Sequence, residues 1–392
     1  MASMAEVLNR FADEYCKHRI LSFEQQRLIR DIRECRTHVL GGHMTACTSC
    51  GHIKVHYNSC GNRHCPSCQG VNKEKWILER ENDLLPVKYF HVVFTLPAEL
   101  RSICYQNKRL VYNLLFTCAW QILDAFSKDP RQKLLARMGM IAVLHTWTQQ
   151  LLYHPHLHCI VPAGGMDEAG HWKHTKSKGD FLFHVTAMGQ TFRGKLMEQL
   201  ILLYKQKKLT LEGKIAHLKQ KHDFWQLKKK LYATNWVVHT EKPFKKPDMV
   251  IEYLARYTHK IAISNYRIKA IDDDGITFTY LDRGNKNKQE TMKLSPERFI
   301  SRFLLHVLPR GFCKIRHYGF LATRVKQQCL TQIRESLGMK EQAIKPRLTV
   351  KDVLRITKGI DPDLCPECKQ GIMVCIQELP RLRGSPNFRK CS

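Results

Sequence analysis

Acidic residues are scarce in this sequence of 392 residues. Only 35 Asp and Glu stand against 64 Lys and Arg, which leaves a formal net charge of +29. An excess of this size is far more than solubility requires, so it indicates a polyanionic partner, either nucleic acid or an anionic membrane surface. The hydrophobic fraction of 43% and the charged fraction of 25% are ordinary for a globular protein and exclude a disordered or collagen-like chain.

Long hydrophobic runs are also missing. The longest, residues 110–126, is interrupted by polar residues such as Asn113 and Asp124, whereas a membrane-spanning helix needs about 20 predominantly apolar residues. The first residues lack the uninterrupted apolar core of a secretory signal. We therefore expect a soluble cytoplasmic protein that has no membrane partner.

The sequence contains no internal repeat and no low-complexity linker. Apolar residues at helical spacing, with Ser22 and Gln25 as a capping box, predict amino-terminal helices. From Lys88 the pattern changes to strand-like runs. Residues 192–235 predict a lysine-rich helical insert, and a turn around Gly275 predicts a β-hairpin.

These patterns predict an α+β fold in which an antiparallel sheet is flanked by helices. We expect three parts. Residues 1–85 would form a helical amino-terminal domain, residues 86–310 a central domain, and residues 311–392 a basic carboxyl-terminal region.

The window from Cys47 to Cys68 has few aliphatic residues, so an apolar core cannot hold it together. It contains two CxxC pairs, Cys47 with Cys50 and Cys65 with Cys68. Each pair places two thiolates on one tight turn, and two such turns give the tetrahedral sulfur environment that Zn²⁺ prefers. Disulfides are disfavoured in a reducing compartment. We predict that these four cysteines bind one structural zinc ion.

Other cysteines and histidines leave alternatives open. Cys60 or a neighbouring histidine could replace one of the four cysteines or serve a second ion. A second zinc site would need partners for the isolated pair Cys365 and Cys368, for which Cys375 and Cys391 are the candidates. The alternative to metal binding is that reduced cysteines simply pack.

In the segment HPHLHCIVPAGG, His156 and His158 flank one residue, so a strand would point both imidazoles to one face. One such pair is weak evidence, because strand histidines are usually hydrogen-bonded. The preceding run AVLHTWTQQ can pair antiparallel with it and would bring Gln149 opposite His158. We predict a divalent-metal site of His156, His158 and Gln149. His145 is the alternative third ligand, and Mg²⁺ or Mn²⁺ would hold a scissile phosphate there.

Tyr253 and Tyr257 are four residues apart, so a helix would present both phenols on one face. Arg256 and Lys260 add positive charge beside them and are candidate DNA contacts. Two tyrosines at this spacing are usually core or interface residues. The histidine strand upstream favours a nucleophilic role, in which tyrosine attacks a phosphodiester.

Taken together, these motifs resemble the HUH two-tyrosine transposases of rolling-circle insertion sequences, the IS91 type, which carry an amino-terminal zinc-binding domain. The matching stretches include YNSCGNRHCPSCQ, VLHTWTQQLLYHPHLHCIVPAGG and KIRHYGFLA, and the resemblance spans about residues 40–325. The resemblance implies that residues 1–85 are a zinc-binding, DNA-binding domain and that residues 86–310 are the catalytic domain, with an HUH endonuclease core. His156 and His158 would be its metal ligands, Tyr253 and Tyr257 its nucleophiles, and the four cysteines the zinc ligands.

The resemblance implies an enzyme, a DNA transposase that cleaves and rejoins single-stranded DNA at the ends of its own element and at a target. The reaction would pass through a 5′-phosphotyrosine, and the bound protein would associate with the bacterial nucleoid. A rolling-circle replication initiator needs the same residues and is one alternative. The other is a non-catalytic zinc-dependent DNA-binding regulator, against which the intact histidine and tyrosine motifs argue.

The helical insert supplies further candidate DNA contacts. Lys228, Lys229 and Lys230 follow Phe224 and Trp225, and exposed aromatic rings can stack on unpaired bases. A lysine-rich helix is often only a solvated face. The large positive excess favours DNA binding here.

Overall fold

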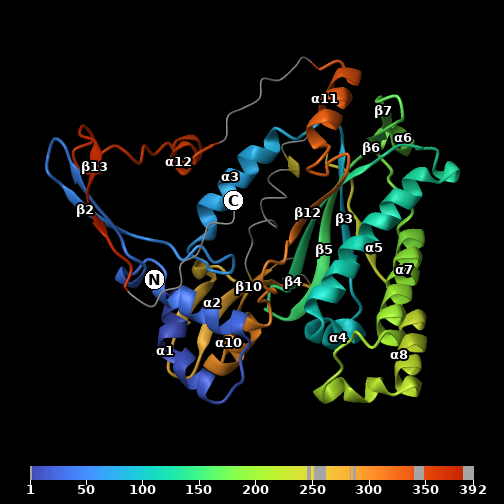
Figure 1. The fold of residues 1–392 in the computed structure, drawn as a ribbon, viewed down its shortest axis with the longest axis horizontal. Helices are drawn as coiled ribbons and strands as arrows, with labels where there is room; N and C mark the ends of the chain where they lie inside the picture. Colours follow the sequence, from blue (N-terminus) through green and yellow to red (C-terminus); the bar gives the residue numbers. More distant parts are fainter. Residues whose placement is uncertain are drawn as a thin grey trace.

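The centre of the molecule is a five-stranded antiparallel sheet with the strand order β12-β4-β5-β3-β8 (Figure 1). The computed structural model describes residues 2–244, 249–250, 262–282, 284–285, 288–339 and 348–382. The strands of the central sheet are β3 (Tyr89–Thr95), β4 (Gly139–Trp147), β5 (Tyr153–Pro162), β8 (Val238–Thr240) and β12 (Ile315–Gly319).

Helices cover one face of this sheet. Phe90, Val92 and Phe94 of β3 point to this face, because alternate residues of a strand share a side. They are buried in a core formed with four helices, α4 (Arg101–Gln106), α5 (Lys108–Lys128), α7 (Val185–Lys205) and α8 (Lys221–Ala233). The lysine-rich insert therefore belongs to this helical layer.

The opposite face is covered at the end that carries Tyr89, Ile141 and Ile160. These side chains are buried in a core that includes Phe320, and Trp76 packs against it. The helices at this end are α3 (Gln69–Glu81) and α11 (Lys326–Ser336), and β6 (Gly164–Met166), β7 (Trp172–His174) and α6 (Lys176–Gly179) follow β5 in the chain. The same face continues along β3, β4 and β5 to a group of histidines.

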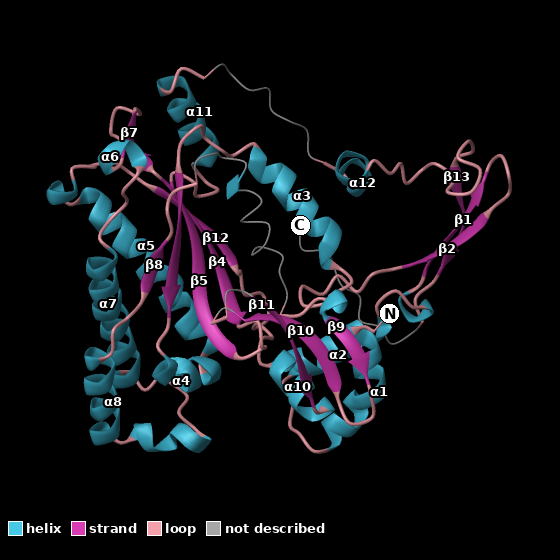
Figure 2. Ribbon diagram, turned by 180° about the vertical axis from the view of Figure 1, so that it is seen from behind, coloured by secondary structure: helices cyan, strands magenta, loops and turns pink. Residues whose placement is uncertain are grey.

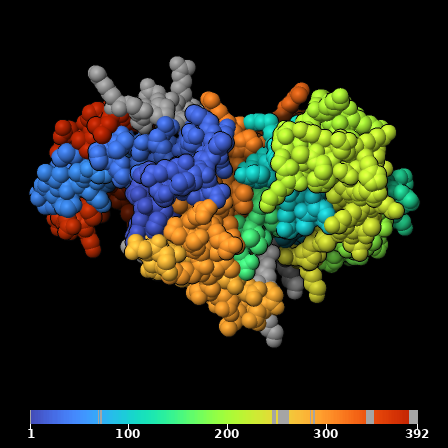
Figure 3. Space-filling view, turned by 90° about the horizontal axis from the view of Figure 1, so that it is seen from below, coloured from blue at the N-terminus to red at the C-terminus, as the bar shows by residue number. Residues whose placement is uncertain are grey.

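A second body combines both halves of the chain. The hairpin predicted around Gly275 is confirmed, since β10 pairs with β9 on one side and with β11 on the other. The predicted capping box at Ser22 and Gln25 is also present. The first helices share one core with this sheet and α10, and the two segments lie side by side in Figure 3. Its elements are α1 (Met4–Lys17), α2 (Phe23–Glu34), β9 (Ile268–Ile271), β10 (Ile276–Asp282), β11 (Lys288–Leu294) and α10 (Pro296–Leu304).

A third sheet projects from the rest of the molecule (Figure 2). Its order is β13-β1-β2, so it joins β1 (Gly42–Cys47) and β2 (Ile53–Tyr57) to β13 (Met373–Leu379), more than 300 positions later. The helix α12 (Val350–Lys358) packs against α3. The carboxyl-terminal segment thus contacts the amino-terminal part at two places. The expected boundaries after residues 85 and 310 stay predictions.

The α+β class is confirmed, and the antiparallel sheet is flanked by helices as expected. Within the described residues, no helix has the length and apolar character needed to cross a membrane. The helix predicted around Tyr253 and Tyr257 falls in residues 251–261, outside the described residues. Short 3₁₀ helices connect the elements at His38–Leu40, Ala98–Leu100, Pro130–Gln132, Gly213–Lys219 and Asn265–Arg267.

The turn after β12 requires glycine at position 319. Its φ is +63°, and an added Cβ would lie 1.8 Å from the Met138 carbonyl oxygen. We expect Gly319→Ala to lower the free energy of unfolding by about 2 to 5 kcal/mol, because the left-handed backbone would be strained and the added methyl group would overpack the turn. Gly311 is the matched control, because its φ is +69° and nothing lies within 4 Å of an added Cβ. Gly311→Ala should lower the free energy of unfolding by the backbone strain alone, about 1 to 2 kcal/mol. If urea unfolding showed the same loss of unfolding free energy in both variants, it would contradict the close β12–β4 contact.

Candidate active site and thiol clusters

Three histidines meet on the face of the central sheet opposite α5 and α7. His156 and His158 of β5 point to the same side, as the HxH spacing predicts, and His145 of β4 lies directly opposite His156. One ring nitrogen from each histidine lies within 4.8 Å of the other two. Two neighbouring strands therefore bring three nitrogen donors to one point, which suits a metal ion.

Hydrogen bonds at both ring nitrogens orient His156. Its Nδ1 atom lies 2.6 Å from the carbonyl oxygen of His154 and donates its proton there. The Nε2 atoms of His156 and His158 are 3.1 Å apart. This arrangement fixes the ring and its tautomer in the way that metal-binding histidines require.

A chain of polar groups orients His158. Its Nδ1 atom is 2.8 Å from Nε2 of His91, whose own Nδ1 atom is 3.3 Å from a carboxylate oxygen of Glu241. If Nε2 of His158 binds a cation, its Nδ1–H donates to His91, and Nδ1–H of His91 then faces the carboxylate. His91 is only 2% exposed. The sequence analysis missed it, although a single histidine in the apolar run YFHVVFTL was the available signal.

A cleft of about 530 Å³ opens over the histidines. One wall is the central sheet, and the other is the end of the β10 hairpin with Tyr280, Leu281 and Asp282. Trp147 and His239 also line it. The cleft therefore lies where the second body meets the central sheet.

Gln149 does not lie where the expected strand pairing would place it. The expected pairing of Gln149 with His158 is wrong, because Val143 lies opposite His158 and β4 ends at Trp147 after an irregularity in the register. Gln149 instead lies in the following turn, where its carbonyl oxygen accepts a hydrogen bond from Arg267. Gln149 does line the cleft, but His145 is the side chain that joins the two β5 histidines.

The predicted nucleophiles and two predicted DNA contacts lie outside the described residues. Tyr253, Tyr257, Arg256 and Lys260 all fall within residues 251–261. Val250, three positions before Tyr253, is fully buried in the core on the histidine-bearing face of the sheet. Their roles stay predictions.

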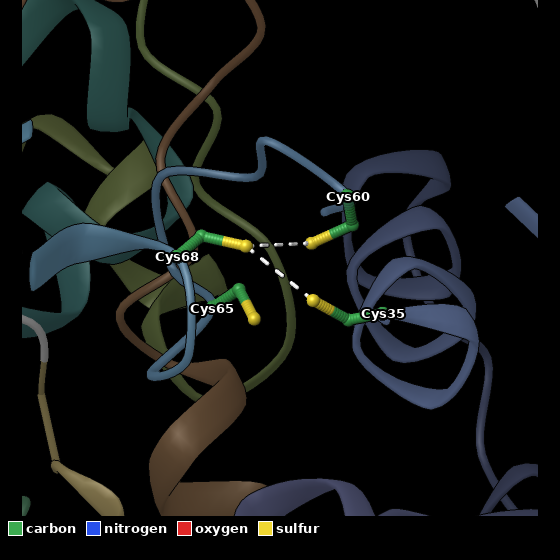
Figure 4. A group of neighbouring side chains, drawn as sticks. All are labelled: Cys35, Cys60, Cys65 and Cys68. Atoms are coloured by element: carbon green, nitrogen blue, oxygen red, sulfur yellow. Dashed lines mark hydrogen bonds between the residues drawn. The ribbon is translucent and has the colours of Figure 1, made fainter. Parts of the chain in front are cut away.

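Four cysteines of the amino-terminal part converge on one point (Figure 4). Cys35 ends α2, and Cys60, Cys65 and Cys68 come from the loop before α3. Sγ of Cys68 is 3.4 Å from Sγ of Cys35 and 3.5 Å from Sγ of Cys60. Hydrogen bonds from these two thiols lower the pKa of Cys68, and contact with Cys35 raises the pKa of Cys60. Four thiolates this close repel one another, so the donor set fits Zn²⁺, which would hold all four ionised.

The single zinc site predicted from the two CxxC pairs is wrong in its grouping. Cys65 and Cys68 belong to the cluster just described, whereas Cys47 and Cys50 lie with Cys365 and Cys368 in a separate one. The reason is topological, because β1 carries Cys47 away from the loop and pairs it with β13.

Among the alternatives for the amino-terminal cluster, Cys60 is a member and His64 is not. Nε2 of His64 accepts a hydrogen bond from the backbone of Leu308. Cys35 was missed, since it lies outside the window that the spacing singled out.

The lysine-rich helix lies in the layer on the far face of the sheet from the histidines. Phe224 is 1% exposed and stacks on Tyr204, so its predicted stacking on DNA bases is wrong. The ammonium group of Lys228 lies 4.6 Å from the centre of the Trp225 ring. DNA contacts by Lys228, Lys229 and Lys230 stay predictions.

Comparison with known proteins gives two family matches and two close relatives. Residues 139–329 match the family "Putative transposase", and residues 7–96 match "Transposase zinc-binding domain". The chain is 40% identical to "Putative transposase y4qJ" of Sinorhizobium fredii (strain NBRC 101917 / NGR234), over 98% of this chain and 97% of the relative. It is 33% identical to "Transposase for insertion sequence element IS801" of Pseudomonas savastanoi pv. phaseolicola, over 85% of this chain and 79% of the relative. No solved structure matches.

The matched regions coincide with the two sites. The transposase match contains His145, His156 and His158, and the zinc-binding match contains all four cysteines of the amino-terminal cluster. Structural zinc therefore fits both the matched domain and its thiols. The chain belongs to the insertion-sequence transposases of the IS91 type, with an amino-terminal zinc-binding domain.

Proposed function

We propose that this transposase cleaves and rejoins single-stranded DNA at the ends of its own element through a 5′-phosphotyrosine intermediate. The observation that carries the proposal is the convergence of His145, His156 and His158 at a cleft. A site of this kind positions a scissile phosphate beside a nucleophile. The protein would act in the cytoplasm, on DNA of the nucleoid.

The three histidines would hold one divalent cation. A bound Mg²⁺ or Mn²⁺ supplies charge that polarises the phosphodiester and stabilises the departing oxygen. Three imidazole nitrogens favour Mn²⁺ over Mg²⁺, because Mg²⁺ prefers oxygen ligands and water. His156 is held by the His154 carbonyl and His158 by His91, so both rings are oriented before DNA arrives.

The nucleophile would be the phenol of Tyr253 or Tyr257. Its oxygen forms a bond to phosphorus, the bond from phosphorus to the 3′ oxygen breaks, and the phenol proton is released as the 3′ oxygen takes up a proton. The products are a 5′-phosphotyrosine and a free 3′-hydroxyl. One phosphoester replaces another, so no nucleotide cofactor is needed, and a 3′-hydroxyl at the target can reverse the step.

The lining of the cleft supports a single-stranded substrate. Trp147 and Tyr280 lie on opposite walls and are only partly buried. One face of the Trp147 ring stacks on His145, with ring centres 4.6 Å apart. Unpaired bases stack on partly exposed aromatic side chains, whereas bases in a duplex are already stacked on one another. The net charge of +29 supplies attraction for the backbone.

The proposed function is tested with single-stranded oligonucleotides taken from both flanks of the element. We expect a 3′-hydroxyl product and a 5′ product that carries covalent protein, followed by rejoining to a second strand. Covalent cleavage at the element ends without transfer to an unrelated target would favour a replication initiator. Binding without any cleavage would favour a regulator.

The histidine cluster predicts metal-dependent cleavage. Substitution of Ala for His145, His156 or His158 should reduce cleavage at least about 100-fold, as expected for the loss of a catalytic metal ligand or its orientation. Single-stranded DNA binding should stay near normal, because phosphate contacts elsewhere supply most of the affinity. EDTA should abolish cleavage and Mn²⁺ should restore it. The exposed His171 gives the control variant His171→Ala, which should cleave normally. Full cleavage in EDTA would contradict a catalytic metal.

The His91 contact predicts a variant that cleaves poorly for lack of metal. His91→Phe removes the acceptor for His158 and should raise the Mn²⁺ concentration for half-maximal cleavage about 10- to 100-fold. Saturating Mn²⁺ should restore most of the rate. The amide oxygen of Gln can accept the same hydrogen bond. His91→Gln should therefore need an Mn²⁺ concentration between those of the wild-type protein and His91→Phe. A defect that added Mn²⁺ leaves unchanged would show that His91 acts in another way.

The tyrosines distinguish covalent transfer from hydrolysis. Tyr253→Phe with Tyr257→Phe should eliminate the covalent 5′ adduct, while each single change should lose transposition and can keep cleavage of one strand. Phe keeps the ring and removes only the hydroxyl, so packing is preserved. Tyr153→Phe is a useful control, since its buried hydroxyl already bonds Tyr112 at 2.7 Å. An adduct that survives the double change, mapped by mass spectrometry of peptides, would refute the assignment and direct attention to the exposed Tyr266.

A further inference from the structure

The second thiol cluster contains two cysteines from each end of the chain. Sγ of Cys47 is 3.6 Å from Sγ of Cys368, and Sγ of Cys50 is 3.7 Å from Sγ of Cys365. All four sulfur atoms lie within 4.8 Å of one another. This spacing is too wide for a disulfide, whose sulfur atoms are about 2 Å apart, and it fits four ligands around one ion.

The backbone around both pairs is shaped for bound thiolates. The amide N–H groups of Ser49 and Cys50 point to Sγ of Cys47 at 3.4 and 3.5 Å, and the amide of Gly371 points to Sγ of Cys368 at 3.4 Å. Such N–H donors stabilise a charged sulfur. Each CxxC turn thus stabilises one of its own thiolates through its own backbone N–H groups.

The two turns also bind each other directly. The backbone N–H of Thr48 donates to the carbonyl of Ile372 at 3.0 Å, and the N–H of Ile372 donates to the Thr48 hydroxyl at 3.1 Å. A Cβ at Gly371 would lie 2.3 Å from Sγ of Cys47. The close approach at the cluster therefore needs glycine at position 371, as expected for a built site.

Little apolar packing is available to hold these segments together. Ile53 is 55% exposed, Ile376 is 52% exposed, and the strands β2 and β13 contain no buried residue. Backbone pairing of three short strands without a core is marginal in water. Within the described residues, the cysteine cluster is therefore the main source of stability for the β13-β1-β2 sheet.

We propose that Cys47, Cys50, Cys365 and Cys368 bind a second structural zinc ion, which joins the two ends of the chain in one zinc ribbon. The site goes beyond the matched zinc-binding domain, because Cys365 and Cys368 lie outside residues 7–96 and outside residues 139–329. It fixes β13 beside β1 and anchors the carboxyl-terminal segment to the amino-terminal part. It is independent of the chemistry at the histidines.

The first test counts zinc in the full-length protein by native mass spectrometry, in the His156→Ala background so that the histidine cluster adds none. We expect two zinc ions per chain. Cys365→Ser with Cys368→Ser should leave one, and Cys35→Ser with Cys60→Ser should also leave one. Cys375 is exposed on β13 and lies outside both clusters, so Cys375→Ser should keep two. Two ions in the Cys365 and Cys368 double variant would overturn the proposal.

The second test needs no destabilising change. In the wild-type protein, N-ethylmaleimide should label Cys375 rapidly, while Cys365 and Cys368 should react only after a strong zinc chelator is added. Peptide mapping gives each rate. Rapid labelling of Cys365 and Cys368 in protein that holds one zinc ion would refute the second site, even if the serine variants fail to fold.

Discussion

The antiparallel pairing of β4 with β5 is the constraint on which the histidine cluster depends. It places His145 opposite His156, and the alternation of β5 adds His158 on the same face. A slip of one residue would turn every histidine toward the helices and every apolar neighbour toward the cleft. Leu144 and Leu157, which also lie opposite each other, are buried on the helical face and make such a slip costly. The core packing thereby fixes the arrangement of the three histidines.

Electrostatics divides the molecule into two kinds of surface. The whole chain carries a net charge of +29, yet the described residues that line the cleft include six histidines and two carboxylates, Glu241 and Asp282, and neither lysine nor arginine. His306, next to this region, is fully buried, and burial lowers its pKa to about 3. A neutral, hydrogen-bonded site can accept a divalent cation, whereas a cluster of charged imidazoles would repel it. In the proposed function, the positive charge that attracts DNA would therefore lie outside the residues that line the cleft.

The local patterns of the sequence predicted local structure well. The capping box at Ser22, the hairpin at Gly275 and the shared face of His156 and His158 depend on neighbours within a few positions, and all three are present. What failed depended on where the chain turns and on distant partners. The chain turns between Thr148 and Leu152, which places Val143 rather than Gln149 opposite His158. Two of the cysteines grouped with Cys47 are more than 300 positions away. Two CxxC pairs look alike in sequence, so only the strand topology decides which pairs share an ion.

One core connects the amino-terminal thiols to the catalytic cleft. Cys65 is buried in the same cluster as Phe278 of β10 and Leu151 of the turn after β4. The carbonyl of Leu151 lies 3.1 Å from Nε2 of His306, and that of Gln150 accepts from Arg302 at 3.0 Å. The β10 wall of the cleft therefore packs in the same core as the cysteines of the amino-terminal cluster. The turn beside the histidines packs in this core too. Because interiors are tightly packed and transmit strain, the cysteines of the amino-terminal cluster and one wall of the histidine cleft belong to a single packing unit.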